Sequence, residues 1–211
     1  MWPLVSALTR VARRIDPELW KQYNVRVPTQ YNDCWLIPYL DGVRAPTEGN
    51  PIKDNIPFIV VQHQKTAWLA EAATRTNADV LTWIDFGIFH VHTGEDYPQP
   101  EDVFEFVKRI DGSQQVAMPG SAFTPKLEDI TSFSPESARF RFCGTVIVCP
   151  RRWAIALHQQ MSQIALAVIR GTLTFESNVW ALAECYGFPI RHYPIYQWGK
   201  ELLTNYSCST Q

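Results

Sequence analysis

The sequence predicts an α/β domain of three layers, in which a mixed, mostly parallel central sheet is flanked by helices. Three observations lead to this prediction. Helical patterns alternate with short apolar runs along the chain. The run 78–84 is apolar enough for a strand buried on both faces, and 139–149 also has a strong strand pattern. The 211 residues are 46% hydrophobic and 19% charged. This composition suits one domain over 1–211, with 1–57 as its less regular part and 58–200 as its core.

The first quarter of the chain contains few regular patterns. Apolar residues recur at helical spacing over 4–15, which predicts a helix. The proline-rich stretch 22–57 shows little periodicity and is predicted to be irregular. Short apolar runs predict brief strands at Trp35–Tyr39 and Phe58–Val61.

The middle of the chain is more periodic. Good helix formers over 66–75 predict a helix, and the apolar run 78–84 that follows predicts a buried strand. Two prolines introduce a further helix over 100–110, whose apolar residues recur every three or four positions. A short strand is expected at 115–118.

The last third predicts a strand and two helices, followed by a final strand. The run 139–149 alternates and then becomes continuously apolar, which indicates a strand. Pro150 ends this strand and opens an amphipathic helix that closes at Gly171. A second helix is expected over 175–186 and the last strand over 189–195.

Charge and motif content exclude several functional classes. The formal net charge is −2, whereas proteins that act on nucleic acid or anionic membranes usually carry a basic surplus. The sequence contains no run of 18 uninterrupted apolar residues, so we expect no transmembrane segment. The chain has no P-loop, dinucleotide-binding, zincin or nucleophile-elbow motif.

The cysteines bear on the compartment. There are five, with no C-x-x-C spacing, and the apolar amino terminus is too short for a signal peptide. We therefore expect free thiols and a cytoplasmic location, with Cys143 and Cys149 as small core residues rather than a redox pair. The basic face of helix 4–15 (Arg10, Arg13 and Arg14) could contact a membrane surface peripherally. A solvated face is the alternative.

Four residues near the ends of predicted strands and helices are candidates for a ligand site. Asp85 follows the strand 78–84, so it belongs at the carboxyl edge, and Gly87 would let the backbone approach a ligand closely. Glu176 opens a predicted helix, where it is either a first-turn carboxylate favoured by the helix dipole or a general base. Gly144 interrupts a strand of large residues, which suggests close approach of another group.

Three histidines offer a different chemistry. His90 and His92 share a face of an extended chain, a spacing that suits a metal ion but also an ordinary surface strand. His192 lies in the last predicted strand and could meet Asp85 across the cleft. Eight tryptophans and eight tyrosines are compatible with carbohydrate binding, although most of them are expected in the core.

Several segments together resemble the GT-A-type glycosyltransferases, and more closely the HtrL/YibB-like group of bacterial proteins. The resemblance rests on short motifs between about residues 50 and 200: Gln64-Lys65, a helix, Ala78 to Ile88 with its Trp83-Ile84-Asp85-Phe86-Gly87 centre, Phe142-Cys143-Gly144, Thr174 to Asn178, and Arg191-His192-Tyr193. It implies a GT-A-like fold that holds a nucleotide-sugar at the sheet edge.

The resemblance also implies roles for individual residues. Asp85 matches the first aspartate of the D-x-D motif, and Gly87 stands where the second, metal-binding aspartate would be, which leaves Mn²⁺ or Mg²⁺ coordination in question. Glu176 matches the acidic residue that binds sugar hydroxyls or acts as base, and Gly144 matches a residue that lines the pocket. His192 matches a metal ligand late in the chain, and His90 is another candidate metal ligand. The remaining substrate-binding candidates are Lys65, Trp83, Arg139, Asn178 and Arg191, whose three cations could stabilise a diphosphate leaving group.

The sequence thus predicts a glycosyltransferase-like protein that moves a sugar, such as a hexose, from a nucleotide-sugar donor to a glycan or lipid-linked acceptor. Two alternatives remain open. One is a degenerate protein of the same fold that binds a sugar or glycan without turnover. The other is a metal-dependent hydrolase built on Asp85, His90, His92 and His192.

Overall fold

The computed structural model describes residues 30–50, 54–85, 100–110, 113–121, 134–138, 141–195 and 201–206. Five of the sequence predictions fall outside these ranges. They are the helix over 4–15 and the candidate site residues Gly87, His90, His92 and Arg139.

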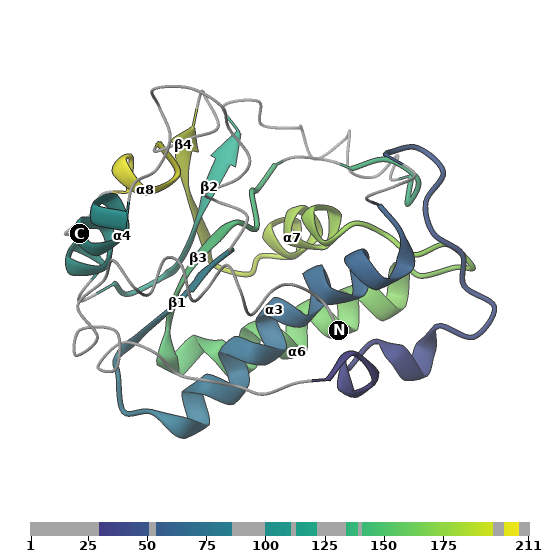
Figure 1. The fold of residues 1–211 in the computed structure, drawn as a ribbon, viewed down its shortest axis with the longest axis horizontal. Coiled ribbons are helices and arrows are strands. Elements are labelled where there is room, and N and C mark those ends of the chain that lie inside the picture. Colours follow the sequence, from purple (N-terminus) through teal and green to yellow (C-terminus); the bar gives the residue numbers. More distant parts are fainter. Residues whose placement is uncertain are drawn as a thin grey trace.

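A four-stranded mixed sheet lies at the centre of the described structure (Figure 1). Its strands are β1 (Val80–Ile84), β2 (Val116–Ser121), β3 (Val146–Pro150) and β4 (Ile190–Ile195), arranged in the order β1-β3-β2-β4. Strand β3 is antiparallel to both β1 and β2, whereas β2 and β4 are parallel. The sheet is therefore mixed, as predicted, but it is not mostly parallel. Two of its three neighbouring pairs are antiparallel, because β3 runs against both of its neighbours.

Helices cover both faces of this sheet, as the sequence predicts. On one face lie α3 (Ile56–Arg75), α6 (Arg151–Val168) and α7 (Glu176–Cys185), over a core that includes Ile147 and Trp180 (Figure 1). On the other lie α4 (Pro100–Arg109) and the short α8 (Glu201–Thr204), over a separate core. The architecture is a three-layer α/β arrangement.

Helix α3 corrects the first of two wrong strand predictions. It begins at Ile56 and includes the apolar run 58–61, which was expected to be extended. The side chain of Asn55 accepts a hydrogen bond from the Phe58 backbone N–H at 3.0 Å, and Pro57 stands in the first turn. Both features stabilise a helix start. A short apolar run fits a buried helix face as well as a strand, and here the cap decides.

The second wrong strand prediction is 35–39. The chain forms two 3₁₀ turns there, η1 (Tyr31–Asp33) and η2 (Ile37–Tyr39). Pro38 occupies the start of η2, where its missing N–H and fixed φ cost nothing. Trp35 is attached to α3 by two hydrogen bonds, from its backbone N–H to Gln64 Oε1 (3.0 Å) and from its indole N–H to the His63 carbonyl (3.1 Å).

The remaining elements agree with the prediction, except that β3 is shorter than expected. The described part of the predicted strand 139–149 is irregular over 141–145, apart from an isolated β-bridge between Phe142 and Gly120, and β3 starts only at Val146. The helix after Pro150 ends at Val168, and Gly171 follows with φ +80°, a conformation that favours glycine. In the part of the chain that the structure describes, no helix is both long and apolar enough to cross a bilayer.

Candidate active site at the carboxyl edge of β1

Helix α3 carries a row of four polar side chains that are all buried: His63, Gln64, Lys65 and Thr66. Burying a polar group costs free energy unless it finds partners, and each member of the row has one. His63 Nε2 donates to the Thr174 carbonyl at 2.8 Å, and Thr66 Oγ1 is hydrogen-bonded to His158 Nδ1 at 3.0 Å. The row joins α3 to α6 and to the segment that leads into α7.

Lys65 is the centre of the candidate site. Its side chain is 3% exposed, and its ammonium contacts Glu176 Oε1 at 2.8 Å, the Gly144 carbonyl at 3.1 Å and Asp85 Oδ2 at 3.2 Å. Four elements thereby meet at one point: α3, the end of β1, the turn before β3 and the first residue of α7. The sequence places Asp85 at the carboxyl edge of the sheet, and the family resemblance implies that Gly144 and Glu176 line the same pocket. In the structure all three contact the Lys65 ammonium.

The reversed direction of β3 explains this convergence. Ile84, the last residue of β1, pairs with Val146, the first residue of β3. The carboxyl end of β1 therefore meets the amino end of β3, and the Asp85 backbone N–H donates to the Thr145 carbonyl at 2.6 Å. Gly144 follows directly along this edge.

Gly144 is required by close packing. A Cβ at this position would overlap Glu176 Oε1 and would lie 3.3 Å from Lys65 Nζ. Any larger residue would therefore displace the Glu176 carboxylate from the ammonium. The sequence-based expectation that another group approaches Gly144 closely is confirmed, and the group is the Lys65–Glu176 pair.

The electrostatics of the three charged groups are coupled. Burial raises the pKa of the Glu176 carboxyl, Lys65 opposes this, and the Asp85 charge adds to the rise. Burial disfavours the Lys65 ammonium, but the Glu176 and Asp85 carboxylates outweigh it and raise the pKa of Lys65. Lys65 is thus held as a cation, and Glu176 is a stronger base than an exposed glutamate.

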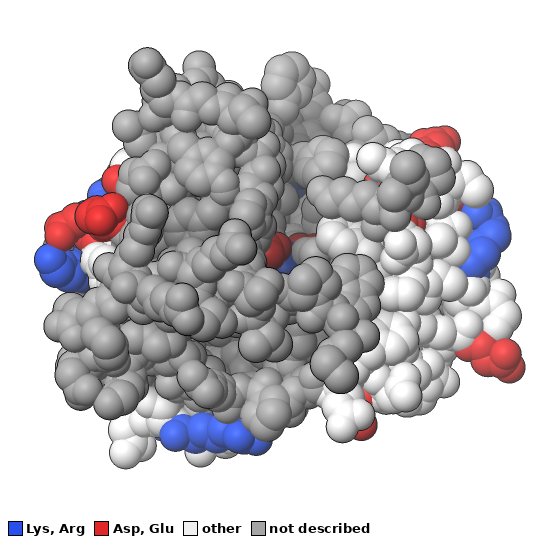
Figure 2. Space-filling view, viewed as in Figure 1, with Lys and Arg blue, Asp and Glu red and all other residues white. Residues whose placement is uncertain are grey.

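A pocket lies beside Glu176, between the first turns of α3 and α7. Phe58, Ile59 and Gln62 line it from α3, and Phe175, Glu176 and Ser177 line it from the other side. Its exposed surface is mainly apolar, with two aromatic rings and a carboxylate at one point. In the view of Figure 2, the described side chains of both charges are scattered around the undescribed residues.

Three other predicted binding residues lie elsewhere or serve the packing. Trp83 stacks on Trp68 of α3 with ring centroids 5.1 Å apart and joins the core under α3. Asn178 is buried and donates to the Ser137 carbonyl at 2.9 Å and to Thr174 Oγ1 at 3.0 Å. Arg191 lies over the Tyr206 ring at 5.1 Å.

His192 does not approach Asp85. It lies on β4, level with Met118, and two strands separate β4 from β1. Three strand spacings place it about 14 Å from the level of Trp83. His192 instead belongs to a second cluster, in which Arg141 Nη2 donates to His192 Nδ1 at 3.0 Å.

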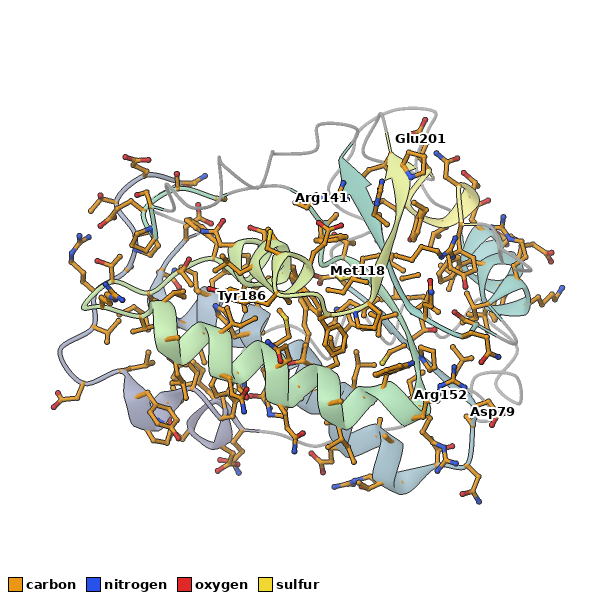
Figure 3. All side chains as sticks on the ribbon, turned by 180° about the vertical axis from the view of Figure 1, so that it is seen from behind. Asp79, Met118, Arg141, Arg152, Tyr186 and Glu201 are labelled. Atoms are coloured by element: carbon orange, nitrogen blue, oxygen red, sulfur yellow. The ribbon has the colours of Figure 1, made fainter. Side chains whose placement is uncertain are left out.

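Sequence reasoning missed Arg141 and Glu184, the other members of this second cluster. Arg141 is buried, lies near β2 and α7 (Figure 3), and donates to both Glu184 carboxylate oxygens, at 2.7 and 2.8 Å. Partial burial and the Arg141 charge lower the pKa of His192. A sequence signal existed, since a charged residue at the start of an apolar run must find a partner when that run is buried.

A divalent metal does not fit the carboxylates of the first cluster. The Lys65 ammonium already occupies the position between Asp85 and Glu176 that such an ion would take. Among the residues that the structure describes, no three or more His, Cys, Asp or Glu side chains are grouped to hold a metal.

Comparison with known proteins finds no match of this chain to any family model, to any curated protein or to any solved structure.

Proposed function

We propose that the protein is a GT-A-like glycosyltransferase of the HtrL/YibB-like type, which transfers a sugar from a nucleotide-sugar to a glycan or lipid-linked acceptor in the cytoplasm. One observation carries the proposal. The Asp85–Lys65–Glu176 cluster lies at the carboxyl edge of β1, beside a pocket with aromatic walls. Ligands of α/β sheets bind at this edge.

Glu176 is suited to act as the general base. Its carboxylate is mostly buried, its side chain being 11% exposed, and burial raises its pKa, which makes it a better proton acceptor. In an inverting transfer it would take the proton of the acceptor hydroxyl as that oxygen attacks the sugar carbon and the nucleotide diphosphate leaves. Asp85, 29% exposed, would bind hydroxyl groups of the donor from the end of β1.

The pocket is small and open to solvent, so a sugar ring would rest on its aromatic lining rather than enter it. Phe58 and Phe175 line it together with Glu176. The C–H faces of a pyranose pack against aromatic rings, while its hydroxyls need an acceptor such as a carboxylate.

A second candidate is a protein that binds a sugar or glycan on the same fold without turnover. The contact between Lys65 and Glu176 favours this alternative, because a carboxylate held in an ion pair is already partly neutralised. A third candidate is a hydrolase built on Asp85, His90, His92 and His192. His192 lies far from Asp85 in the sheet, and His90 and His92 lie outside the described residues.

The test combines ligand binding with turnover. Thermal unfolding is measured against a panel of nucleotide-sugars, where a ligand at 100 times its Kd adds about 2.7 kcal/mol and raises Tm by roughly 5–10 °C. With the donor that binds, Glu176→Gln should keep the shift and lose at least about 100-fold in kcat. Asp85→Ala should lose the shift, while Glu105→Gln on the exposed face of α4 serves as the control.

Each result separates the candidates. A nucleotide-sugar that binds without turnover, together with a glycan that stabilises the protein, identifies the binding protein. Wild-type activity in Glu176→Gln would remove Glu176 as the base. No shift with any nucleotide-sugar contradicts the transferase proposal.

A further inference from the structure

The ammonium of Lys65 has an environment that is typical of a bound cation. Its three contacts are all oxygen atoms, two from carboxylates and one from a backbone carbonyl, at 2.8 to 3.2 Å. Carboxylate and carbonyl oxygens are also the ligands that Mg²⁺, Mn²⁺ and Ca²⁺ select in proteins. The three ammonium protons match these three acceptors, so Lys65 meets its hydrogen-bonding capacity inside the protein.

The neighbouring residues are built around this cation. Gly144 has no side chain because a Cβ there would overlap Glu176 Oε1 and approach Lys65 Nζ. Lys65 lies at the tenth position of the twenty-residue helix α3, where packing on both sides keeps its side chain from swinging out. The carboxylates remain partly open to solvent, Asp85 more than Glu176, whereas the ammonium lies behind them.

A divalent ion would have to compete with Lys65 for the same oxygens. Two cations a few ångströms apart in a partly buried site repel each other by several kcal/mol. Metal–oxygen distances are about 2.0–2.6 Å, shorter than the Lys65 contacts, so the ion would also need the carboxylates to move off the ammonium.

We propose that Lys65 is a built-in cation that replaces a divalent metal at this edge of the sheet, holding Asp85 and Glu176 in fixed positions without a bound ion. Lys65 is thus a positioning residue. It does not itself contact a leaving group, because its protons are directed to Glu176, Asp85 and the Gly144 carbonyl. The inference concerns the charge of the cluster and does not depend on sugar transfer.

The proposal predicts that removing the ammonium creates a metal site. In Lys65→Met the side chain keeps a similar length, and the two carboxylates and the carbonyl face an uncharged group. The variant should be less stable than wild type, and millimolar Ca²⁺ or Mn²⁺ should restore several degrees of Tm. Wild type and the control Lys108→Met, on the surface of α4, serve as references. Any change that Ca²⁺ or Mn²⁺ causes in their Tm should be the same with and without Asp85→Asn.

A double variant assigns the metal response to this cluster. Adding Asp85→Asn to Lys65→Met should abolish the stabilisation by Ca²⁺ or Mn²⁺. A folded Lys65→Met that ignores both ions would overturn the proposal.

A second measurement uses the wild-type protein and does not require any variant of Lys65 to fold. Tb³⁺ luminescence sensitised by tryptophan reports a bound ion near the Trp68–Trp83 pair, which lies close to Asp85 in the chain. We expect the wild-type signal to be unchanged by Asp85→Asn. A wild-type signal that Asp85→Asn removes would show that an ion binds beside Lys65, and the proposal would be wrong. Neither readout uses a nucleotide-sugar, so failure of the transferase proposal is recognised separately.

Discussion

Two charged clusters lie at opposite ends of α7, and each contains a buried cation with a different set of oxygen partners. At the first residue of the helix, Lys65 meets Glu176, Asp85 and a carbonyl. Glu184 lies eight residues further along the helix, and both of its carboxylate oxygens accept hydrogen bonds from Arg141. A lysine ammonium is a compact charge that several oxygens can surround, whereas an arginine guanidinium matches one carboxylate along its planar edge.

The two clusters also differ in the ratio of carboxylates to cations, which bears on the role that each can have. The first contains two acidic groups for one cation, both partly open to solvent. In the second, one carboxylate matches one cation, and Arg141 Nη1 has no hydrogen-bond partner in the described part of the chain. The second cluster therefore joins α7 to β4 through His192, while the first places two carboxylates at the edge of the sheet.

The largest expected effect compares the two cations directly. Lys65→Met leaves two carboxylates at a mostly buried point and should reduce the free energy of unfolding by about 3–5 kcal/mol. Arg141→Met should cost less, about 1–3 kcal/mol, because the Glu184 side chain is 30% exposed and water can solvate it. Urea unfolding at neutral pH measures both variants. A greater loss for Arg141→Met would reverse the comparison.

A smaller effect is expected at the glycine that lies under each cluster. A Cβ at Gly120 would lie 2.8 Å from His192 Cβ and 3.3 Å from the Arg141 carbonyl, so Gly120→Ala must move backbone and should cost about 1–3 kcal/mol. At Gly144 the obstacle is the end of the Glu176 side chain, which can turn away. Gly144→Ala should therefore lose less stability in urea but should lose the activity or ligand binding that depends on Glu176. Equal loss of function in both variants would argue against this division.

The last effect is the pH dependence of stability, which is absent at neutral pH and develops only below about pH 6.5. Burial lowers the pKa of His63 from 6.5 to about 4, with the Thr174 carbonyl opposing and Lys65 adding to the shift. The unfolded chain therefore binds a proton at a pH where the folded protein does not, and stability falls as the pH drops from about 6.5 to 4, by up to about 3 kcal/mol. His192 is shifted in the same direction but is exposed, so its contribution should be smaller.

Replacing each histidine checks that order. Urea unfolding of His63→Gln between about pH 7 and pH 4 should show a flatter profile than wild type, while His192→Gln should stay close to it. A wild-type profile in His63→Gln would mean that His63 is not the buried group that controls acid stability.

The sequence was sufficient to predict the layered fold and three members of the first cluster. Asp85 follows an apolar strand, Glu176 opens a helix, and Gly144 interrupts large residues, so each is marked by local pattern. General sheet topology places Asp85 at the edge, and the family resemblance added Gly144 and Glu176 to the same pocket. The family resemblance added Lys65, although as a ligand for phosphate rather than as the partner of two carboxylates.

The rest depended on contacts between distant segments. The apolar run 58–61 has no periodicity that separates a strand from a helix, and the Asn55-Ile56-Pro57 start signal before it was the better guide. Arg141 pairs with Glu184, 43 residues further along the chain, and no local pattern links them. His192 was placed near Asp85 because strand order was unknown, and that order puts two strands between them.

The stacked Trp68–Trp83 pair gives the protein an optical signal of its own. The ring centroids are 5.1 Å apart and the indole planes differ by 18°, and at this separation we expect the electronic transitions of the two rings to couple. Trp68 is three residues from Lys65, and Trp83 is two residues from Asp85. A ligand that moves the end of β1 relative to α3 would change this coupling. Spectroscopy of the unlabelled chain can therefore follow events at the sheet edge in real time.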